Sequence, residues 1–282
     1  VARYGAQVEI APEALEEVAA TRERVEELAQ DPTPVYGIST GFGALARRHI
    51  PEEMRAQLQL SLVRSHAAGT GPEVEEEVIR ALMLLRLSTL CTGRTGVRPV
   101  VVETYAKALN AGIVPVVREY GSLGCSGDLA PLAHCALALL GEGEVRVNGE
   151  LQGAGEALAA AGIEPLQLRE KEGLALINGT DGMLGQLCLA ITDLRAAAKT
   201  ADIATAMTVE GLLGTLVVFA DDLQQLRPHP GQADAAANIL QVAEGSQILE
   251  AALEEFKKNQ VQDAYSVRCA PQVAGGFRDT LA

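Results

Sequence analysis

The stretch EYGSLGCSGDLAPLAH, residues 119–134, joins a permissive loop to the start of an apolar helix. Residues 121–127 contain three glycines, two serines and a cysteine, and apolar residues at helical spacing follow from Leu129. A connecting turn needs only one or two glycines. The extra backbone freedom therefore indicates a loop with a chemical role at the entry of a buried helix.

The tripeptide Cys125-Ser126-Gly127 has the composition needed to build an electrophile from backbone atoms. Gly127 lacks a Cβ, so its nitrogen can approach the carbonyl carbon of Cys125 and close a five-membered ring. Loss of the Ser126 hydroxyl as water would leave a carbon–carbon double bond, and the adjacent Asp128 could assist removal of a proton. Because a peptide nitrogen is a poor nucleophile, the loop must be strained and held by its surroundings. The alternative is an ordinary helix start, capped by Ser126 or Asp128.

Composition narrows the class of protein. The chain has 282 residues, of which 48% are hydrophobic and only 3% aromatic, and this length allows a large core in one or two domains. The abundance of alanine and leucine favours helix, so the fold is expected to be mainly α. A net charge of −14 argues against nucleic acid or an anionic membrane surface as a partner.

The distribution of cysteine, histidine and apolar residues adds three expectations. No apolar run reaches the roughly 18–20 residues that a transmembrane helix needs, and no signal peptide opens the sequence. The five cysteines are widely spaced without a CxxC pair, and the four histidines do not fall at metal-ligand spacing. We therefore expect a cytoplasmic protein with reduced thiols and no metal.

Helical patterns alternate with unusual loops along the chain. Helices are predicted over residues 10–30, 51–68, 97–111, 129–140, 153–162 and 233–256, in a segment opened by Pro72, and as two long helices between 183 and 226 interrupted around 211–214. A small β-hairpin is predicted over residues 144–152, because Asn148-Gly149 suits a type I′ turn. Glycine-rich loops occupy residues 31–43 and 171–185 as well as the opening stretch.

The segment GSLGCSGDLAPLAH closely resembles the signature of the aromatic amino acid ammonia-lyase family, which includes histidine-, phenylalanine- and tyrosine-specific lyases and related aminomutases. In that family an Ala-Ser-Gly tripeptide cyclises autocatalytically to 4-methylideneimidazol-5-one (MIO). Cys125 stands at the alanine position, and since only its backbone carbonyl enters the ring, the change is compatible with cyclisation. The resemblance covers essentially the whole chain. It implies the fumarase/aspartase-like helical superfamily, with a long-helix bundle, and no metal or external cofactor.

Three other segments match the same family. They are VYGISTGFG at 35–43, INGT at 177–180 and QDAYSVR at 262–268. The resemblance implies that Tyr36 is the catalytic base and that Asn178 binds the MIO carbonyl or the substrate carboxylate. Gln262 would contact the substrate, Tyr265 would orient the MIO or shuttle a proton, and Arg268 would hold the substrate carboxylate with its planar fork.

Ser65 and His66 bear on the substrate. The pair resembles that of the histidine-specific members, whereas phenylalanine-specific members carry Phe-Leu and tyrosine-specific members His-Leu. An imidazole ring needs a hydrogen-bonding partner, which His66 offers. The resemblance therefore implies elimination of ammonia from L-histidine to give trans-urocanate, a step of histidine catabolism. The alternatives are a tyrosine or phenylalanine ammonia-lyase, an aminomutase, or a non-enzymatic helical fragment without MIO.

From the residues alone, plainer roles explain the same positions: a packing tyrosine at Tyr36, a core histidine at His66, a turn asparagine at Asn178 and a surface arginine at Arg268. Family members are much longer than this chain, which is therefore expected to be an N-terminal fragment. Residues 1–180 would form the MIO-containing domain, and residues 181–282 would begin the central helix bundle. Apolar surface exposed on such a bundle favours a homo-oligomer, a tetramer in the full-length family.

Overall fold

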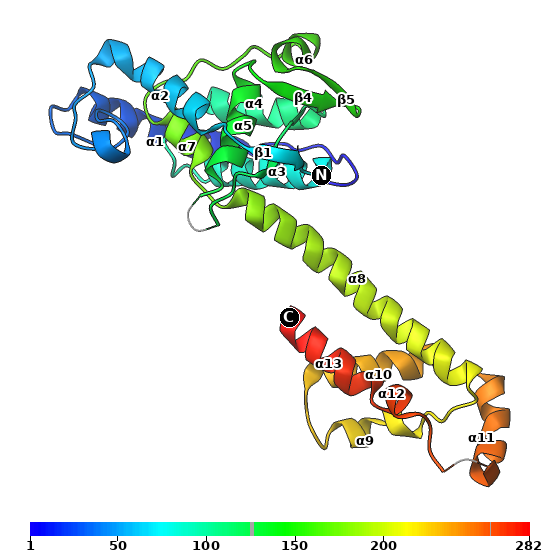
Figure 1. Ribbon diagram of the computed structural model, residues 1–282. Helices are drawn as coiled ribbons and strands as arrows, with labels where there is room; N and C mark the ends of the chain where they lie inside the picture. The colour runs from blue at the N-terminus through cyan, green and yellow to red at the C-terminus, as the bar shows by residue number, and fades with distance from the viewer. Residues whose placement is uncertain (125–126, 260) are drawn as a thin grey trace. The chain divides into compact units, whose positions relative to one another are not determined.

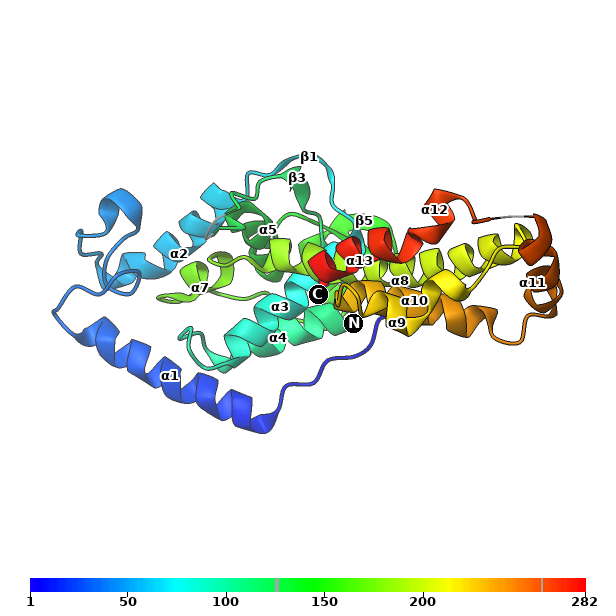
Figure 2. The ribbon, with the colours of Figure 1, turned by 90° about the horizontal axis from the view of Figure 1, so that it is seen from below.

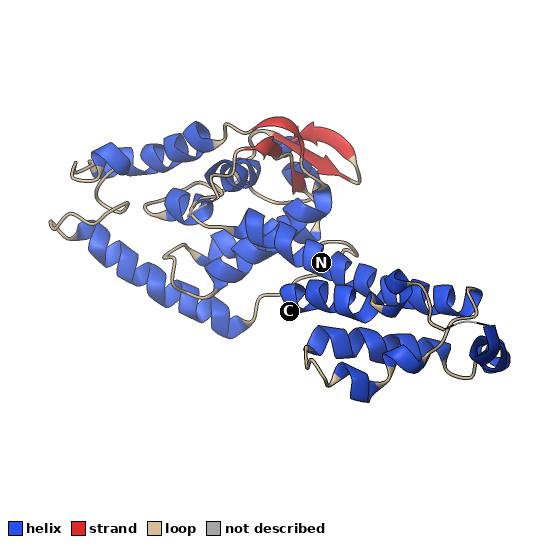
Figure 3. Ribbon diagram, turned by 60° about the horizontal axis from the view of Figure 1, so that its bottom comes forward, coloured by secondary structure: helices blue, strands red, loops and turns tan. Residues whose placement is uncertain are grey.

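The computed structural model describes residues 1–124, 127–259 and 261–282. The chain forms two compact units, Val1–Leu187 and Cys188–Ala282. Helices dominate both, which confirms the mainly α fold, and Figure 3 shows the strands gathered in one small group. The domain boundary at 180/181 stays a prediction.

Seven α-helices are described in the first unit before residue 181. They are α1 (Pro12–Gln30), α2 (Glu52–His66), α3 (Glu76–Cys91), α4 (Pro99–Asn110), α5 (Leu129–Leu139), α6 (Ala154–Ala160) and α7 (Glu172–Ile177), and η1 (Gly43–Leu45) is a single 3₁₀ turn. Proline opens α1 and α4, as predicted, because its fixed φ suits the first helical position and its missing N–H is not needed there. Figures 1 and 2 both show α3 beside α4.

The prediction that Pro72 opens a helix is wrong. Pro72 lies in β1 (Thr70–Glu73), which pairs antiparallel with β3 (Arg118–Tyr120), and α3 begins only at Glu76. Gly71 adopts a φ of 92°, which turns the chain away from helical geometry just before the proline. A proline is tolerated there because the two-stranded sheet has only edge strands.

The predicted hairpin is confirmed. β4 (Glu144–Val147) and β5 (Glu150–Gly153) pair antiparallel, and β2 (Val114–Pro115) extends the sheet on the far side of β4. Asn148 and Gly149 have φ values of 52° and 82°, as a type I′ turn requires. The strands β1, β2 and β3 are too short to show an alternating pattern in the sequence.

The main hydrophobic core lies under α5. Leu132 and Ala133 of this helix are completely buried, and Leu82 of α3 and Tyr105 of α4 pack in the same cluster. Helix α5 also contacts α2 and α7, and these two helices contact each other. The apolar helix after the glycine-rich loop is therefore a fixed support on which the loop is mounted.

The second unit takes most of α8 (Asp181–Gly211) together with η2 (Val217–Phe219), α9 (Asp221–Gln224), α10 (Pro230–Ala243), α11 (Gln247–Asn259), α12 (Tyr265–Arg268) and α13 (Ala270–Leu281). The predicted second long helix up to residue 226 is wrong, because the chain turns at Leu213 with a φ of 55° and forms only short helical turns afterwards. Helices α10 and α13 pack closely, since a Cβ on Gly275 would stand 2.7 Å from the backbone of Gln232.

One helical segment bears on the expectation that no apolar run reaches membrane-spanning length. The stretch Glu172–Gly211, which contains α7 and α8, is long and apolar enough to cross a membrane by length and composition. The expectation that no segment reaches this measure is therefore wrong. Core helices of soluble proteins meet the same measure, so the property identifies a packing helix as readily as a membrane helix.

A buried ion pair supports the turn between α7 and α8. Arg86 of α3 and Asp181 are only 2% and 6% exposed, and they form a salt bridge through Nη2. Arg86 Nη1 also donates to the Ala175 carbonyl oxygen at 3.1 Å. Gly179 lies directly over the pair, and a Cβ there would overlap the Arg86 guanidinium. The turn that carries Asn178 therefore requires glycine at its second position.

We predict that Gly179→Ala destabilises the protein by about 1–3 kcal/mol, because the added methyl group forces the buried ion pair apart. Urea unfolding measures the change. Gly276→Ala is the matched control, since its Cβ would meet no atom within 4 Å in the middle of α13. That substitution should leave stability unchanged or raise it by up to about 1 kcal/mol. Equal effects of the two substitutions would contradict the role given to Gly179.

Candidate active site

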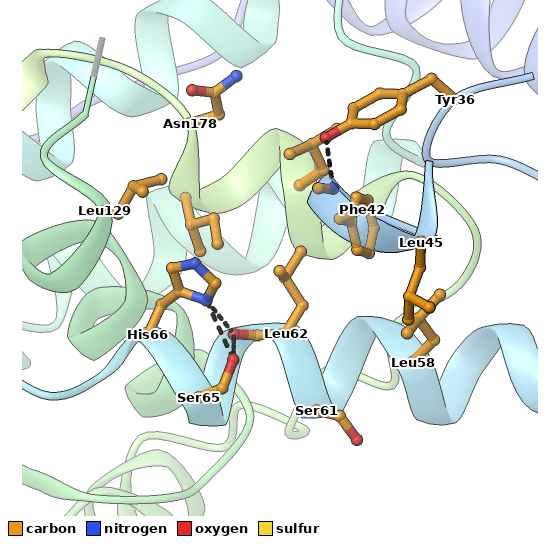
Figure 4. Close-up of a pocket in the computed structure, with 13 residues that line it drawn as sticks. Tyr36, Phe42, Leu45, Leu58, Ser61, Leu62, Ser65, His66, Leu129 and Asn178 are labelled. Carbon is orange, nitrogen blue, oxygen red and sulfur yellow. Dashed lines mark hydrogen bonds between the residues drawn. The ribbon is translucent and has the colours of Figure 1, made fainter. Parts of the chain in front are cut away.

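A cavity of about 560 Å³ opens between the loop that follows α1 and helices α2, α5 and α7 (Figure 4). Four residues singled out in the sequence line it together: Tyr36, Ser65, His66 and Asn178. The rest of the lining is mostly apolar and comprises Phe42, Gly43, Leu45, Leu58, Ser61, Leu62, Leu129, Leu174 and Ile177. An apolar cavity with a few convergent polar groups is the usual form of a small-molecule site.

Tyr36 stands on a turn at one side of the cavity. Its ring meets Phe42 edge to face with centroids 5.9 Å apart, and its hydroxyl oxygen accepts a hydrogen bond of 3.4 Å from the Gly43 N–H. Gly37 has a φ of 73°, and a Cβ there would stand 3.0 Å from the Phe42 ring. Glycine at position 37 therefore allows the turn that brings the Tyr36 ring against Phe42. Half of the Tyr36 side chain stays exposed.

Ser65 and His66 occupy the last turn of α2. The Ser65 hydroxyl donates to the Leu62 carbonyl oxygen at 2.9 Å. His66 Nδ1 lies 2.9 Å from the same oxygen and 3.1 Å from Ser65 Oγ (Figure 4). Residues three and four positions after Leu62 lie on the same side of the helix, so the side chains of Ser65 and His66 can both reach its carbonyl oxygen.

Asn178 ends α7. Its backbone N–H donates to the Leu174 carbonyl at 3.1 Å, and its φ of −99° takes the chain out of the helix. The next residue is Gly179, whose carbonyl accepts a 2.8 Å hydrogen bond from the Asp128 N–H. The carboxamide of Asn178 thus projects from a turn that is tied on one side to the ion pair and on the other to the glycine-rich loop.

Cys125 and Ser126 lie outside the described residues, but the flanks of the loop are defined. The Leu123 N–H donates to the Gly127 carbonyl oxygen at 3.0 Å, so the two ends of the tripeptide region are held close together. A Cβ on Gly127 would stand 3.2 Å from the Leu129 side chain, which is tighter than most packing contacts. The space beside Gly127 therefore favours glycine at this position.

Asp128 anchors this loop. It is completely buried, and its carboxylate accepts hydrogen bonds from Ser122 Oγ at 2.5 Å and from the Met183 N–H at 2.9 Å. The simple capping role considered for Asp128 is not observed, since its side chain makes no capping bond to α5. It caps α8 instead, because Met183 lies in the first turn of that helix.

Gln262, Tyr265 and Arg268 belong to the second unit. Tyr265 and Arg268 lie together on α12, with the guanidinium 5.3 Å from the centroid of the tyrosine ring. Arg268 Nε donates to the Asp263 carbonyl oxygen at 2.9 Å, which orients the fork. Their convergence with the cavity of the first unit stays a prediction from the sequence.

Sequence reasoning missed most of the apolar lining. Leu58 and Leu62 show the helical spacing of a buried face, and that pattern does not distinguish a core from a cavity wall. Phe42 and Leu174 gave no signal, because their place in the wall follows from tertiary contacts. Ser61, one turn before Ser65, could have been found from the helical period alone.

The loop, the cavity and the long helix define a lyase scaffold of the aromatic amino acid type. The family model for aromatic amino acid lyases matches residues 1–282, and the chain belongs to this family. It is 61% identical to histidine ammonia-lyase of Streptomyces coelicolor over its whole length, which is 55% of that protein. It is 47% identical to histidine ammonia-lyase of Gloeobacter violaceus, covering 54% of it.

Solved structures give the same picture. Tyrosine aminomutase from Streptomyces globisporus superposes with a TM-score of 0.91 at 40% identity, over 99% of this chain and 56% of the other. Histidine ammonia-lyase from Trypanosoma cruzi gives a TM-score of 0.85 at 38% identity, over 99% of this chain and 50% of the other. The chain spans about half the length of the curated relatives it matches.

His134 connects α5 to the segment that follows His66. Its Nε2 accepts a 3.1 Å hydrogen bond from the Gly69 N–H. Burial, with a smaller contribution from the positive charge of Arg118, lowers the pKa of His134 below its ordinary value. The neutral ring is the form that can accept, so protonation would remove this contact.

We predict that stability falls as the pH is lowered from about 6.5, the ordinary histidine pKa, through the lower pKa of folded His134. Between these two pKa values, His134 binds a proton in the unfolded chain but not in the folded chain. The loss can reach about 1.4 kcal/mol per pH unit. His134→Gln, which keeps an acceptor but does not titrate, should show a shallower decline in urea unfolding between pH 7.5 and 5.5. Parallel curves for the two proteins would contradict the assignment.

Proposed function

We propose that this chain carries part of the active site of a histidine ammonia-lyase, which eliminates ammonia from L-histidine to give trans-urocanate. The observation that supports this most strongly is the presence of Ser65 and His66 in the same cavity as Tyr36 and Asn178. The pair gives an otherwise apolar wall a polar group suited to an imidazole ring. The 61% identity to a curated histidine ammonia-lyase points the same way.

We further propose that Cys125-Ser126-Gly127 forms the MIO group. The hydrogen bond between Leu123 and Gly127 and the tight space at Gly127 support this, because the first holds the flanks of the tripeptide close together and the second favours glycine at its third position. Once formed, MIO is an electrophile that activates the substrate amino group as a leaving group. The chemistry then requires no metal and no external cofactor.

Tyr36 is the proposed base for the β-proton. Its hydroxyl lies at the cavity, and the Gly43 N–H that donates to its oxygen would stabilise negative charge there. Asn178 is proposed to bind the substrate carboxylate or the MIO carbonyl, since its carboxamide offers both a donor and an acceptor. The role proposed for Asp128 is to position the loop, because both of its oxygens already accept hydrogen bonds.

Arg268 is proposed to bind the substrate carboxylate through two parallel hydrogen bonds. Tyr265, which packs under the same guanidinium, would help to orient the MIO, and Gln262 would contact the substrate. The whole enzyme is proposed to be a cytoplasmic homo-oligomer, a tetramer in its full-length form. Its substrate is a small amino acid, and neither nucleic acid nor a membrane is required.

A tyrosine-specific aminomutase is the second candidate, because the fold superposes on the Streptomyces globisporus enzyme at 40% identity. Such an enzyme would return the amine to the β-carbon instead of releasing it. Ser65 favours the histidine-specific lyase over this alternative, as does the higher identity to curated histidine ammonia-lyases.

Intact mass and product absorbance test the proposal. We expect the purified chain to weigh two water molecules less than its sequence, since ring closure and alkene formation each release one. Ultraviolet absorbance should rise with L-histidine and not with L-tyrosine or L-phenylalanine. An unmodified mass would refute MIO formation in this chain, and turnover of tyrosine without histidine would favour the second candidate.

Replacement of Tyr36 tests the base. Tyr36→Phe keeps the edge-to-face contact with Phe42 and removes only the hydroxyl, so we expect kcat to fall by about 10²–10⁴-fold with the loss of two waters intact. Tyr4→Phe is the matched control, because Tyr4 is 92% exposed. A kcat for Tyr36→Phe within twofold of the control would exclude Tyr36 as the base.

A further inference from the structure

The last turn of α2 holds three polar groups in mutual contact. The Leu62 carbonyl oxygen lies 2.9 Å from Ser65 Oγ and 2.9 Å from His66 Nδ1, and the two side-chain atoms are 3.1 Å apart. Figure 4 shows this triangle at the cavity wall, with the other ring nitrogen of His66 pointing away from the helix.

For a neutral His66 ring, only one arrangement of protons satisfies all three contacts. A carbonyl oxygen can only accept a hydrogen bond. The Ser65 hydroxyl must therefore donate to the Leu62 carbonyl, and His66 Nδ1 must be protonated so that it can donate to the same oxygen. The Ser65 oxygen then offers a lone pair to the same Nδ1–H. The opposite tautomer would place the bare lone pair of Nδ1 against the carbonyl oxygen at 2.9 Å, which is repulsive.

We propose that Leu62 and Ser65 fix neutral His66 as its Nδ1–H tautomer, so that Nε2 is a hydrogen-bond acceptor facing the cavity. The consequence for the substrate rests on the proposed function. If the chain acts on an aromatic amino acid, the site selects one whose ring presents an N–H or O–H donor. Ser65 is then a positioning residue, which acts on the substrate only through His66.

The mostly apolar wall of the cavity makes the acceptor at His66 Nε2 important for the choice of substrate. Leu62 and Leu129 line the cavity near His66 and offer the substrate ring no hydrogen bond from their side chains. A ring without a donor would leave Nε2 unpaired in an apolar surrounding, which costs binding free energy. A phenyl ring and an acceptor-only heterocycle should both be disfavoured, the second more strongly because two lone pairs would face each other.

Nitrogen-15 NMR of the chain labelled with ring-¹⁵N histidine reads the tautomer without any need for turnover. At a pH well above 6.5, the ordinary histidine pKa, the signal lost in His66→Gln identifies His66. We expect a protonated Nδ1 and a bare Nε2. Ser65→Ala should shift the tautomer ratio by about fivefold towards Nε2–H, the effect of one hydrogen bond.

Ser61→Ala is the matched control, because Ser61 lines the same cavity one turn earlier but bonds to Gln57. It should leave the His66 signals unchanged. A protonated Nε2 in the unaltered chain, equal populations of the tautomers, or the same response to both serine replacements would overturn the assignment.

The consequence for selectivity is tested with thiazol-4-ylalanine, whose ring accepts but cannot donate. We expect its kcat/KM to be at least about tenfold below that of L-histidine. The ratio should approach one in His66→Gln, since an amide can rotate to present either group. A ratio unchanged by His66→Gln would overturn the selectivity. Absence of histidine turnover would instead count against the proposed function and leave the NMR result standing.

Discussion

The buried carboxylate of Asp128 is the point on which the candidate site depends. A buried negative charge is tolerated only where hydrogen-bond donors surround it, and here they come from Ser122 in the loop and from the backbone at the start of α8. The Asp128 N–H adds a bond to Gly179. One residue thus joins the glycine-rich loop, the start of α5 and the turn that carries Asn178. Any movement of the loop would separate the charge from its donors.

The ion pair of Arg86 and Asp181 continues this support on the other side of Gly179. Removing either partner would leave a buried charge uncompensated, so the two side chains hold each other in place. Gly179 lies between the pair and Asp128, with no room for a side chain. The position of Asn178 is consequently fixed by electrostatics on both faces of its turn, although Asn178 itself is exposed to the cavity.

How much the sequence could predict depended on the range of the interactions involved. The starts of α1 and α4 followed from Pro12 and Pro99, and the hairpin turn followed from Asn148, because these signals act within a few residues. The strand at Pro72 was missed because its partner lies some fifty residues further along the chain. The cap that Asp128 provides to α8 was missed for the same reason, since propensity describes a residue's own segment. The family resemblance singled out Tyr36, His66 and Asn178 in three separate segments, but only the fold brings them to one cavity.

This difference in range separates two properties of the candidate site. The reactivity proposed for the loop relies on contacts between distant parts of the chain, because Asp128 must meet Met183 and Gly179 before the loop is held. The proposed recognition of the substrate ring relies on Leu62, Ser65 and His66, which lie within one helical turn. A helix that forms at all brings these three groups together, so the polarity of Nε2 is set locally. Substitutions that loosen the loop should therefore lower its reactivity. They should keep the preference for a substrate ring with an N–H or O–H donor, because Leu62, Ser65 and His66 all lie outside the loop.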